Sequence, residues 1–349
     1  MSKGTRPRYL YHPREVAICG YSNSGKTTLI CKLLARMEEQ WQVAYVKHDA
    51  HRFEMDRPGK DTWNAWQSGA HSILIEDPQH GAWQQKGDLS LFQKRALVVD
   101  HDFALVEGHK KSALPKICIL DESGKILEDL MNGDISQVMA FVGTHDERPM
   151  GLPHELPYIQ RDNLEAVQEI IEDYLEQTSK SKLSALILTG GRSQRMGSDK
   201  ALLKYEGKEQ GLRTYEMLKP HFDDVYLSSR SQQWQGSSLE ELPQINDSFP
   251  SSGPMTGILS AMTQKPGRSW FVIACDLPLV NAEAISKLLR ERNPYRLATY
   301  VESSSDGLPE PLFAIYESRI YGRLLEAYSQ GLHCPCLLYT SDAADEEDS

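Results

Sequence analysis

Gly20–Thr27 reads GYSNSGKT and matches the pattern G-x-x-x-x-G-K-[ST] in full. The apolar run Glu15–Cys19 precedes it and predicts a buried strand. The apolar positions that follow lie on one face of a predicted helix: Leu29, Ile30, Leu33, Leu34 and Met37. A loop of this composition curls so that successive N–H groups point at phosphate oxygens, and the next helix adds its positive N-terminal end. The stretch therefore predicts the strand, phosphate-binding loop and helix of a P-loop NTPase-like domain.

The side chains expected to hold a nucleotide lie in this loop or close to it in the fold. Lys26 would neutralise the β- and γ-phosphates, and the Thr27 hydroxyl would bind Mg²⁺. Glu107 ends the apolar run Phe103–Val106 and is the leading candidate for a second metal-binding acid. The residues predicted to bind nucleotide here are Gly20, Ser22, Asn23, Ser24, Gly25, Lys26, Thr27 and Thr28.

The rest of the first half alternates strand-like and helix-like segments, which favours a parallel sheet covered by helices. The further predicted strands are Val43–Val46, Ser72–Ile75, Leu97–Val99, Phe103–Val106, Ile117–Leu120 and Val138–Val142. Asp162, with Glu165 three residues on, predicts a capping box at the start of a helix. Asp49, His48 and His51 follow the strand Val43–Val46 without a nearby cysteine, so a loop facing the phosphates is favoured over a zinc site.

A second α/β series begins after the polar stretch Gln177–Lys182, which predicts a linker. Its predicted elements are a helix at Ala282–Glu291 and strands at Ser184–Leu188, Val225–Leu227, Trp270–Cys275, Leu297–Val301 and Leu312–Tyr316. The stretches 231–253 and 302–309 are rich in Ser, Gly and Pro and predict loops. We therefore predict two successive three-layer α/β domains over residues 1–178 and 183–333, the second Rossmann-like, with a disordered tail over 334–349.

The composition of the 349-residue chain excludes several classes of protein. A net charge of −11 argues against a nonspecific nucleic-acid binder, and the lack of a long apolar run argues against a membrane span. The six scattered cysteines predict no disulfide framework and favour the reducing cytoplasm. The second half carries 18 basic and 22 acidic residues, but five of these acids lie in the last nine residues, SDAADEEDS. Without them the second half is weakly positive, which suits a domain that binds phosphorylated substrates.

Two loops of the second half combine the residues that phosphoryl chemistry requires. Leu188–Lys200 reads LTGGRSQRMGSDK and places cations, among them Arg195 and Lys200, in a glycine-rich loop after a strand. Asp276 follows the apolar strand of WFVIACDLPLV, at the sheet edge where ligands bind, and its carboxylate suits Mg²⁺. Asp247, in NDSFPSSGPMTG, could reach the nucleotide or the metal.

The first half resembles the molybdopterin-guanine dinucleotide biosynthesis protein B family (MobB) over about residues 14–175. The motifs that carry the resemblance are GYSNSGKTTL, VKHDAHRFEMDRPGKDTW, SGA at 68–70 and LVEGHKKSALPKI. The resemblance implies a P-loop that binds GTP, at most weak GTP hydrolysis, and an adaptor role in guanylation of the molybdenum cofactor. It also implies that Asp56–Thr62 responds to nucleotide or partner. His109 stands where the family usually has an aromatic residue.

The second half resembles the molybdenum cofactor guanylyltransferase family (MobA). Four motifs appear in order: LTGGRSQRMGSDKALL, NDSFPSSGPMTGI, CDLP and EPLFAIY. The resemblance implies transfer of GMP from GTP to Mo-molybdopterin, with Arg195, Lys200 and Asp276 as the catalytic set. Asp276 would also hold Mg²⁺. The nucleotide-binding residues it implies are Leu188, Thr189, Gly190, Gly191, Lys200, Asp247 and Asp276. Thr189 and Ser229 depart from the usual Ala and Asn.

Two alternatives to a fused adaptor and guanylyltransferase stay open. One is a related nucleotidyltransferase that uses CTP in place of GTP or that acts on another phosphorylated acceptor. The other is a nucleotide-binding scaffold without turnover. The expected partners are GTP, Mo-molybdopterin, other cofactor-biosynthesis proteins, and apo-molybdoenzymes or their chaperones. The family's usual Asn- and Pro-containing segment is missing, and HCPCLLYTSDAADEEDS stands after Leu332. We interpret this stretch as an out-of-frame or cloning-derived replacement of the native C-terminus, rather than a metal or redox site at Cys334 and Cys336.

Overall fold

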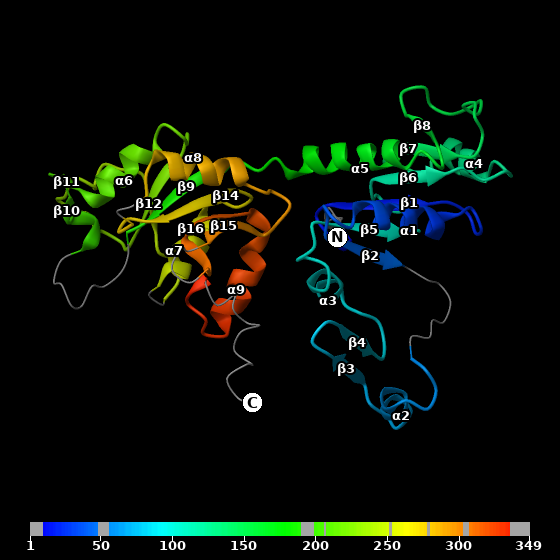
Figure 1. Cartoon of the computed structure of the whole chain (residues 1–349), viewed down its shortest axis with the longest axis horizontal. Helices are drawn as coiled ribbons and strands as arrows, with labels where there is room; N and C mark the ends of the chain where they lie inside the picture. Colours follow the sequence, from blue (N-terminus) through cyan, green and yellow to red (C-terminus); the bar gives the residue numbers. More distant parts are fainter. Residues whose placement is uncertain are drawn as a thin grey trace, which may run out of the picture. The chain divides into compact units, whose positions relative to one another are not determined.

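The chain forms two compact units, Met1–Thr178 and Ser179–Ser349, each built on a six-stranded sheet (Figure 1). The computed structural model describes residues 10–47, 56–189, 199–205, 207–250, 253–277, 280–302 and 307–335. Both units have the predicted α/β architecture. His48, Asp49, His51, Gly190, Gly191 and Arg195 lie outside the described residues.

The sheet of the first unit is entirely parallel, with the order β2-β5-β1-β6-β7-β8. The strands are β1 (Glu15–Cys19), β2 (Val43–Lys47), β5 (Phe103–Glu107), β6 (Lys116–Ile119), β7 (Val138–Gly143) and β8 (Tyr158–Gln160). All residues of β1, β5 and β6 are buried. Parallel strands covered on both faces read as continuous apolar runs, which is why these three were visible in the sequence.

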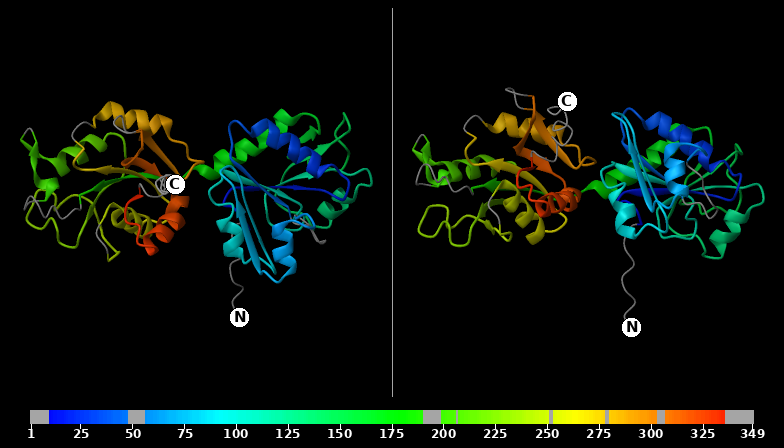
Figure 2. Two further views of the ribbon diagram at one scale, coloured as in Figure 1. Left: turned by 60° about the horizontal axis from the view of Figure 1, so that its bottom comes forward. Right: turned by 90° about the horizontal axis from the view of Figure 1, so that it is seen from below.

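Helices cover both faces of this sheet. The helices of the unit are α1 (Lys26–Met37), α2 (Asp61–Gln67), α3 (Leu91–Ala96), α4 (Lys125–Met131) and α5 (Leu164–Ser179). On one face α1 and α5 lie side by side, joined by a hydrogen bond of 2.8 Å from Arg36 Nε to Gln168 Oε1 (Figure 2). On the other face, Ile126 of α4 packs against Cys19, Cys118 and Phe141. The P-loop strand β1 is thus enclosed, and only its carboxyl end opens to the site.

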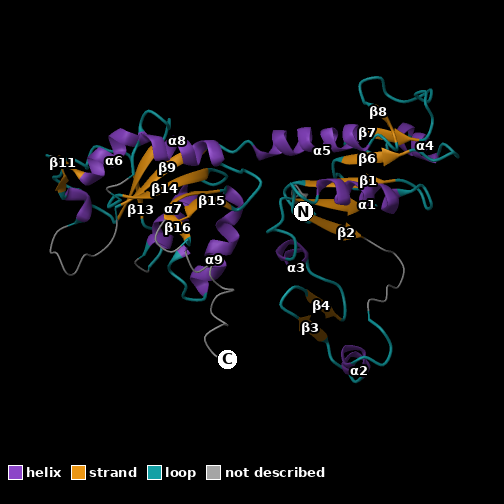
Figure 3. Cartoon of the chain, viewed as in Figure 1, coloured by secondary structure: helices purple, strands orange, loops and turns teal. Residues whose placement is uncertain are grey.

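Two predictions for this unit were wrong, the strand at Leu97–Val99 and the capping box at Asp162, whereas the predicted strand at Ser72–Ile75 is confirmed. Leu97–Val99 is a turn that continues α3, because the Leu97 and Val99 N–H groups donate to carbonyls of that helix. β3 (Ser72–Glu76) does not join the main sheet but forms a separate hairpin with β4 (Gly81–Gln85) (Figure 3). Asp162 does not cap α5. Its carboxylate pairs with Lys32 at 2.9 Å, and Asn163 Oδ1 accepts the Ala166 N–H instead.

The sheet of the second unit is mixed, with the order β13-β12-β9-β14-β16-β15. Its strands are β9 (Leu183–Leu188), β12 (Val225–Ser229), β13 (Gln244–Asn246), β14 (Ser269–Ala274), β15 (Ala298–Glu302) and β16 (Pro309–Tyr316). The first four are mutually parallel, and β16 pairs antiparallel with β14 on one side and with β15 on the other. β13 lies inside the stretch 231–253, so the prediction of a continuous loop there was wrong. A short hairpin, β10 (Lys204–Tyr205) and β11 (Lys208–Glu209), lies outside this sheet.

Two helical layers enclose this sheet as well. The helices are α6 (Gln210–Leu218), α7 (Pro254–Gln264), α8 (Ala282–Glu291) and α9 (Tyr321–Ser329). Alternate residues of β9 point to opposite layers: Ile187 packs with α6 and α8, whereas Leu186 packs with α7 and α9 (Figure 2). The predicted helix Ala282–Glu291 is α8 itself.

α5 continues through the first half of the predicted linker and ends at Ser179, where the Thr178 hydroxyl donates to the Tyr174 carbonyl. Among the described helices of both units, none is long and apolar enough to cross a membrane.

Candidate functional site

The P-loop of the first unit has the strand–loop–helix geometry that the sequence predicts. Gly20 follows β1, and a Cβ atom there would stand 2.5 Å from Ser24 Oγ, so the tight curl requires glycine. Gly25 lies directly before α1 with φ +88°, in the left-handed region. The N-terminal N–H groups of α1 have no side-chain cap, which leaves them available to an anion.

Two polar side chains of this loop have surroundings that suit a bound phosphate. Lys26 Nζ donates to the Tyr21 carbonyl at 2.8 Å, a neutral partner that a phosphate would replace with a charged one. Ser24 Oγ is buried and has no hydrogen-bond partner in the described part of the chain. Buried polar groups are normally satisfied, so both observations fit a phosphate in the loop.

Thr27 and Glu107, the predicted metal-binding pair, lie in direct contact. β5 pairs with β1, and this register brings the Glu107 carboxylate to the Thr27 hydroxyl, which donates to its two oxygens at 2.9 and 3.1 Å. The Tyr45 hydroxyl donates to Glu107 at 2.6 Å, and Lys47 Nζ lies 3.6 Å away. A hydroxyl and a carboxylate are hard oxygen donors, so the pair fits Mg²⁺.

The charge state of Glu107 follows from these contacts. Burial disfavours the charged form, but the two hydroxyl hydrogen bonds and the nearby lysines outweigh it, so the pKa of Glu107 lies below its ordinary value. Burial and the Glu107 hydrogen bond raise the pKa of Tyr45, which keeps this phenol a hydrogen-bond donor. The sequence did not predict the contact of Tyr45 with Glu107, because that contact depends on the sheet order, which places β2 beside β5.

Tyr21 anchors the P-loop to two other segments. Its hydroxyl donates to Asp129 Oδ2 at 2.8 Å, and Lys110 Nζ binds the same oxygen at 2.5 Å. Lys110 also lies over the Tyr21 ring, 3.7 Å from its centroid. The neighbouring His109 adopts φ +53°, and its ring nitrogen bonds the Tyr11 hydroxyl at 2.9 Å. Lys110 and His109 belong to the motif EGHKK, so this stretch supports the loop as well as supplying Glu107.

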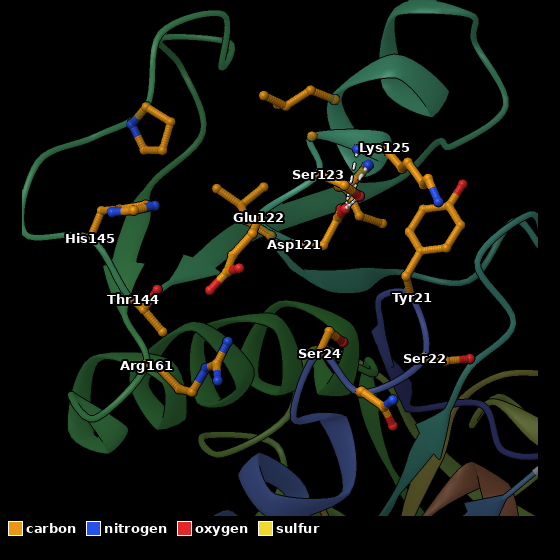
Figure 4. Close-up of a pocket in the computed structure, with 16 residues that line it drawn as sticks. Tyr21, Ser22, Ser24, Asp121, Glu122, Ser123, Lys125, Thr144, His145 and Arg161 are labelled. Carbon is orange, nitrogen blue, oxygen red and sulfur yellow. Dashed lines mark hydrogen bonds between the residues drawn. The ribbon is translucent and has the colours of Figure 1, made fainter.

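A cavity of about 820 Å³ opens beside the P-loop, at the carboxyl ends of β1, β6, β7 and β8 (Figure 4). P-loop residues Tyr21 and Ser24 form one wall, and Asp121, Glu122 and Arg161 face it from the other strands. Arg161 follows β8, and its Nη1 atom lies 3.1 Å from the position that a Cβ on Gly25 would take. No motif marks Arg161 in the sequence.

In the second unit, polar residues gather at the carboxyl ends of the parallel strands. Thr189 directly follows β9, and its hydroxyl donates to the Ser228 carbonyl of β12. The Ser228 hydroxyl in turn donates to Asp247 Oδ1 at 3.1 Å, beyond the end of β13. Asp276 lies two residues after β14, and Lys200 Nζ pairs with its Oδ2 atom at 2.5 Å. Asp199, next to Lys200, accepts a 3.3 Å hydrogen bond from Gln233 Nε2 and lies 3.5 Å from Arg230.

The electrostatics of this edge suit a polyphosphate and a cation. The hydrogen bond and charge of Asp276 raise the pKa of Lys200, which stays a cation, and burial raises the pKa of Asp247. Burial raises the pKa of Cys275 to about 12, so this thiol is no nucleophile near pH 7. Within the described residues, no three His, Cys, Asp or Glu side chains form a metal cage. Single carboxylates at such a site suit Mg²⁺, which keeps water and phosphate ligands.

Ser229 explains one departure from the guanylyltransferase pattern. The side chain is fully buried, and its hydroxyl donates to Gln244 Oε1 at 2.9 Å. It therefore joins β12 to β13, behind the site.

Two family models match the chain, one in each unit. The model described as molybdopterin guanine dinucleotide synthesis protein B matches residues 16–144, and the MobA-like NTP transferase domain matches residues 185–338. Among solved structures, Bacillus subtilis MobB is 27% identical with a TM-score of 0.38, over 46% of this chain and 96% of that one. The Archaeoglobus fulgidus biosynthesis protein A is 26% identical with a TM-score of 0.38, over 46% and 79%.

Curated relatives point to the same pathway. A molybdenum cofactor biosynthesis bifunctional protein of Synechocystis is 42% identical over 157 residues, which is 45% of this chain and 45% of that relative. The match thus spans about half of that relative's length. The molybdenum cofactor guanylyltransferase of Pseudomonas putida is 32% identical over 152 residues, 42% of this chain and 77% of that protein. The chain therefore belongs to the molybdenum cofactor guanylyltransferase family, and it joins this MobA-like domain to a MobB domain.

Proposed function

We propose that the second unit transfers GMP from GTP to Mo-molybdopterin, and that the first unit binds GTP as an adaptor for this reaction. The observation that carries the proposal is the Lys200–Asp276 pair at the carboxyl edge of the second sheet, with Asp247 near the end of β13. The guanylyltransferase relatives supply the substrate class.

The reaction needs no side-chain nucleophile. The terminal phosphate oxygen of molybdopterin attacks the α-phosphorus of GTP, a new P–O bond forms, and the bond to the bridging oxygen breaks to release pyrophosphate. The attacking phosphate is already ionised near neutral pH, so no strong base is required. The protein contributes by orienting both substrates and by stabilising charge that grows on the phosphates.

Lys200 and Arg195 would supply the positive charge. Lys200 pairs with Asp276, and a triphosphate would compete for its ammonium group. Asp276 would then be free to hold Mg²⁺, which neutralises phosphate charge when bound. Leu188, Thr189, Gly190, Gly191 and Asp247 would bind the nucleotide.

In the first unit, the loop from Gly20 to Thr28 would bind the GTP phosphates, and Thr27 and Glu107 would hold Mg²⁺. The bound nucleotide would control contacts with other cofactor-biosynthesis proteins, apo-molybdoenzymes or their chaperones. We place the reaction in the cytoplasm.

Substitution of Asp276 tests the transferase assignment. Asp276→Ala should lower Mg²⁺-dependent release of pyrophosphate from GTP and Mo-molybdopterin by a factor on the order of 100 or more, because the phosphate charge loses its main stabilisation. Asp223→Ala, which removes an exposed carboxylate before β12, is the matched control and should keep full activity. Equal turnover in both variants would overturn the assignment, and the absence of turnover in the parent chain would indicate a scaffold. Competition between GTP and CTP identifies the nucleotide.

Substitution of Lys26 tests the adaptor assignment. Lys26→Ala should abolish GTP binding by the first unit, because the P-loop loses its only side-chain cation. Guanylyl transfer in the isolated reaction should continue at nearly the parent rate. Lys32→Ala, on the exposed side of the same helix, is the control. A collapse of transfer in Lys26→Ala alone would contradict the adaptor role.

A further inference from the structure

We propose that the cavity beside the P-loop holds the nucleoside half of the bound nucleotide, with Arg161 at the sugar–phosphate junction and Glu122 as the residue that selects guanine. The inference rests on the proposed function of the first unit and adds to it the residues that read the base.

The position of the cavity sets the direction of the nucleotide. Thr27 and Glu107, which would hold the metal on the terminal phosphates, lie on the β5 side of β1. The cavity lies on the β6 side, over the carboxyl ends of β6, β7 and β8. A nucleotide whose phosphates fill the P-loop therefore extends its sugar and base into this cavity. Its volume of about 820 Å³ falls in the range of small-molecule sites, about 300–1,000 Å³.

Arg161 is placed to bind the part of the ligand nearest the P-loop. Its backbone N–H donates to the Gly143 carbonyl at 2.8 Å, which fixes the residue at the end of β8. The guanidinium reaches back to Gly25, and Nε is buried with no hydrogen-bond partner in the described part of the chain. Because Arg161 also lines the cavity, its guanidinium is suited to bind a phosphate or ribose oxygen there.

Glu122 and the adjacent Asp121 differ in what their carboxylates do. Asp121 accepts the Ile126 N–H at 3.1 Å and the Lys125 N–H at 3.3 Å, and the Ser123 hydroxyl also donates to it. Its oxygens therefore accept the hydrogen bonds of N–H groups in the first turn of α4. The carboxylate of Glu122 points into the cavity (Figure 4), and among the residues that the structure describes it has no hydrogen-bonding or ionic partner.

A carboxylate in this position distinguishes the purines. Guanine presents two adjacent donors, the N1–H and the 2-amino group, which a carboxylate can accept together. Adenine presents an acceptor at N1, and xanthine presents an oxygen at position 2, and both would repel the charge of Glu122. The ligand class is therefore a guanine nucleotide, read at its N1 and 2-amino edge.

Glu122→Gln tests whether Glu122 selects guanine, because the substitution should weaken the binding of one nucleotide and strengthen that of another. The test uses the full chain with Asp276→Ala, which weakens the second GTP site, and measures GTP and XTP binding by calorimetry. The variant should bind GTP about tenfold more weakly, because the charged acceptor is gone. It should bind XTP more tightly, since the new amide can donate to the 2-oxo group. Glu128→Gln, on the exposed side of α4, is the matched control and should change neither affinity.

Arg161→Ala separates the two roles. It should weaken the binding of GTP and of XTP by the same factor, about tenfold, because Arg161 would contact the sugar–phosphate junction that the two nucleotides share. Arg161→Lys should restore part of the loss. An unchanged ratio of GTP to XTP affinity in Glu122→Gln would overturn the selection by Glu122, and unchanged affinities in Arg161→Ala would overturn the contact at the junction.

The Lys26→Ala arm distinguishes this inference from the proposed function beneath it. If Lys26→Ala abolishes binding and Glu122→Gln leaves the selectivity unchanged, the P-loop binds nucleotide but the base lies elsewhere, and this inference alone fails. If Lys26→Ala binds GTP as the parent does, the nucleotide-binding role of the first unit fails as well.

Discussion

Glu107 shows how single hydrogen bonds set the charge of the P-loop site. The residue is 7% exposed, and its carboxylate accepts hydrogen bonds from Thr27 and Tyr45, which stabilise the ionised form. Because the pKa in the folded state lies below the ordinary value of 4.5, ionised Glu107 stabilises the fold above that pH. The contribution disappears as the pH falls through the folded-state pKa.

Tyr45→Phe should therefore destabilise the first unit at pH 7 by about 1 kcal/mol, because a hydrogen bond to a charged group is lost at a partly exposed site. The difference from the parent should shrink as the pH is lowered through the folded-state pKa of Glu107. Hydrogen exchange of peptides that cover β1 and β5, followed through a urea series at each pH, reports the opening free energy. Tyr205→Phe, in the second unit, is the control. If the loss of opening free energy in Tyr45→Phe did not vary with pH, the stabilising role of ionised Glu107 would be contradicted.

At the same scale, local sequence predicts some side-chain positions and not others. The contact between Thr27 and Glu107 could be anticipated, because a P-loop helix and a neighbouring strand end imply it. The contact of Arg161 with the loop could not, because it depends on where β8 joins the sheet. The binding roles of these residues stay predictions.

At the scale of elements, α7 connects close packing to the second site. Gly257 of α7 faces β9 and β12, where an added Cβ would collide with the Ser228 hydroxyl and stand 2.9 Å from Leu188 Cδ2. Ser228 is the residue that donates to Asp247, and its carbonyl accepts from Thr189. The approach of the helix thus sets the position of both polar contacts.

Gly257→Ala should cost the second unit roughly 1–3 kcal/mol through overpacking, and it should also slow guanylyl transfer, because Ser228 moves away from Asp247. Gly322→Ala on α9 is the matched control. An added Cβ there meets nothing within 4 Å, so both stability and turnover should stay near those of the parent. Thermal unfolding and pyrophosphate release measure the two effects, and a destabilised variant with full turnover would disprove the link to Asp247.

Element prediction succeeded where burial is complete and failed at short or peripheral segments. β1, β5 and β14 are buried throughout and read as apolar runs. β8 and β13 have three residues each, too few for a period to be recognised. Ser72–Ile75 reads as a strand and is one, but nothing in its sequence states that its partner is β4 rather than the main sheet.

For the whole molecule, the charge distribution agrees with two separate ligand sites. The first unit, residues 1–178, carries 20 basic and 27 acidic residues, so the proposed phosphate site would depend on Lys26, Arg161 and backbone N–H groups rather than on overall charge. Two motif sets and two sheets, each with its own core, further imply that each unit responds to its own ligand.

Differential scanning calorimetry of the full chain with and without MgGTP should therefore resolve two transitions. A ligand at 100 times its Kd stabilises the folded state by about 2.7 kcal/mol. For a unit of this size, that corresponds to a rise of roughly 5–10 °C in Tm. Lys26→Ala should abolish the rise in Tm of the first unit and leave that of the second unchanged, because substitutions without shared partners act additively. Asp276→Ala should reduce only the shift of the second unit. A single transition whose Tm both variants change equally would mean that the two units unfold together. Nucleotide binding to one unit would then stabilise the other as well.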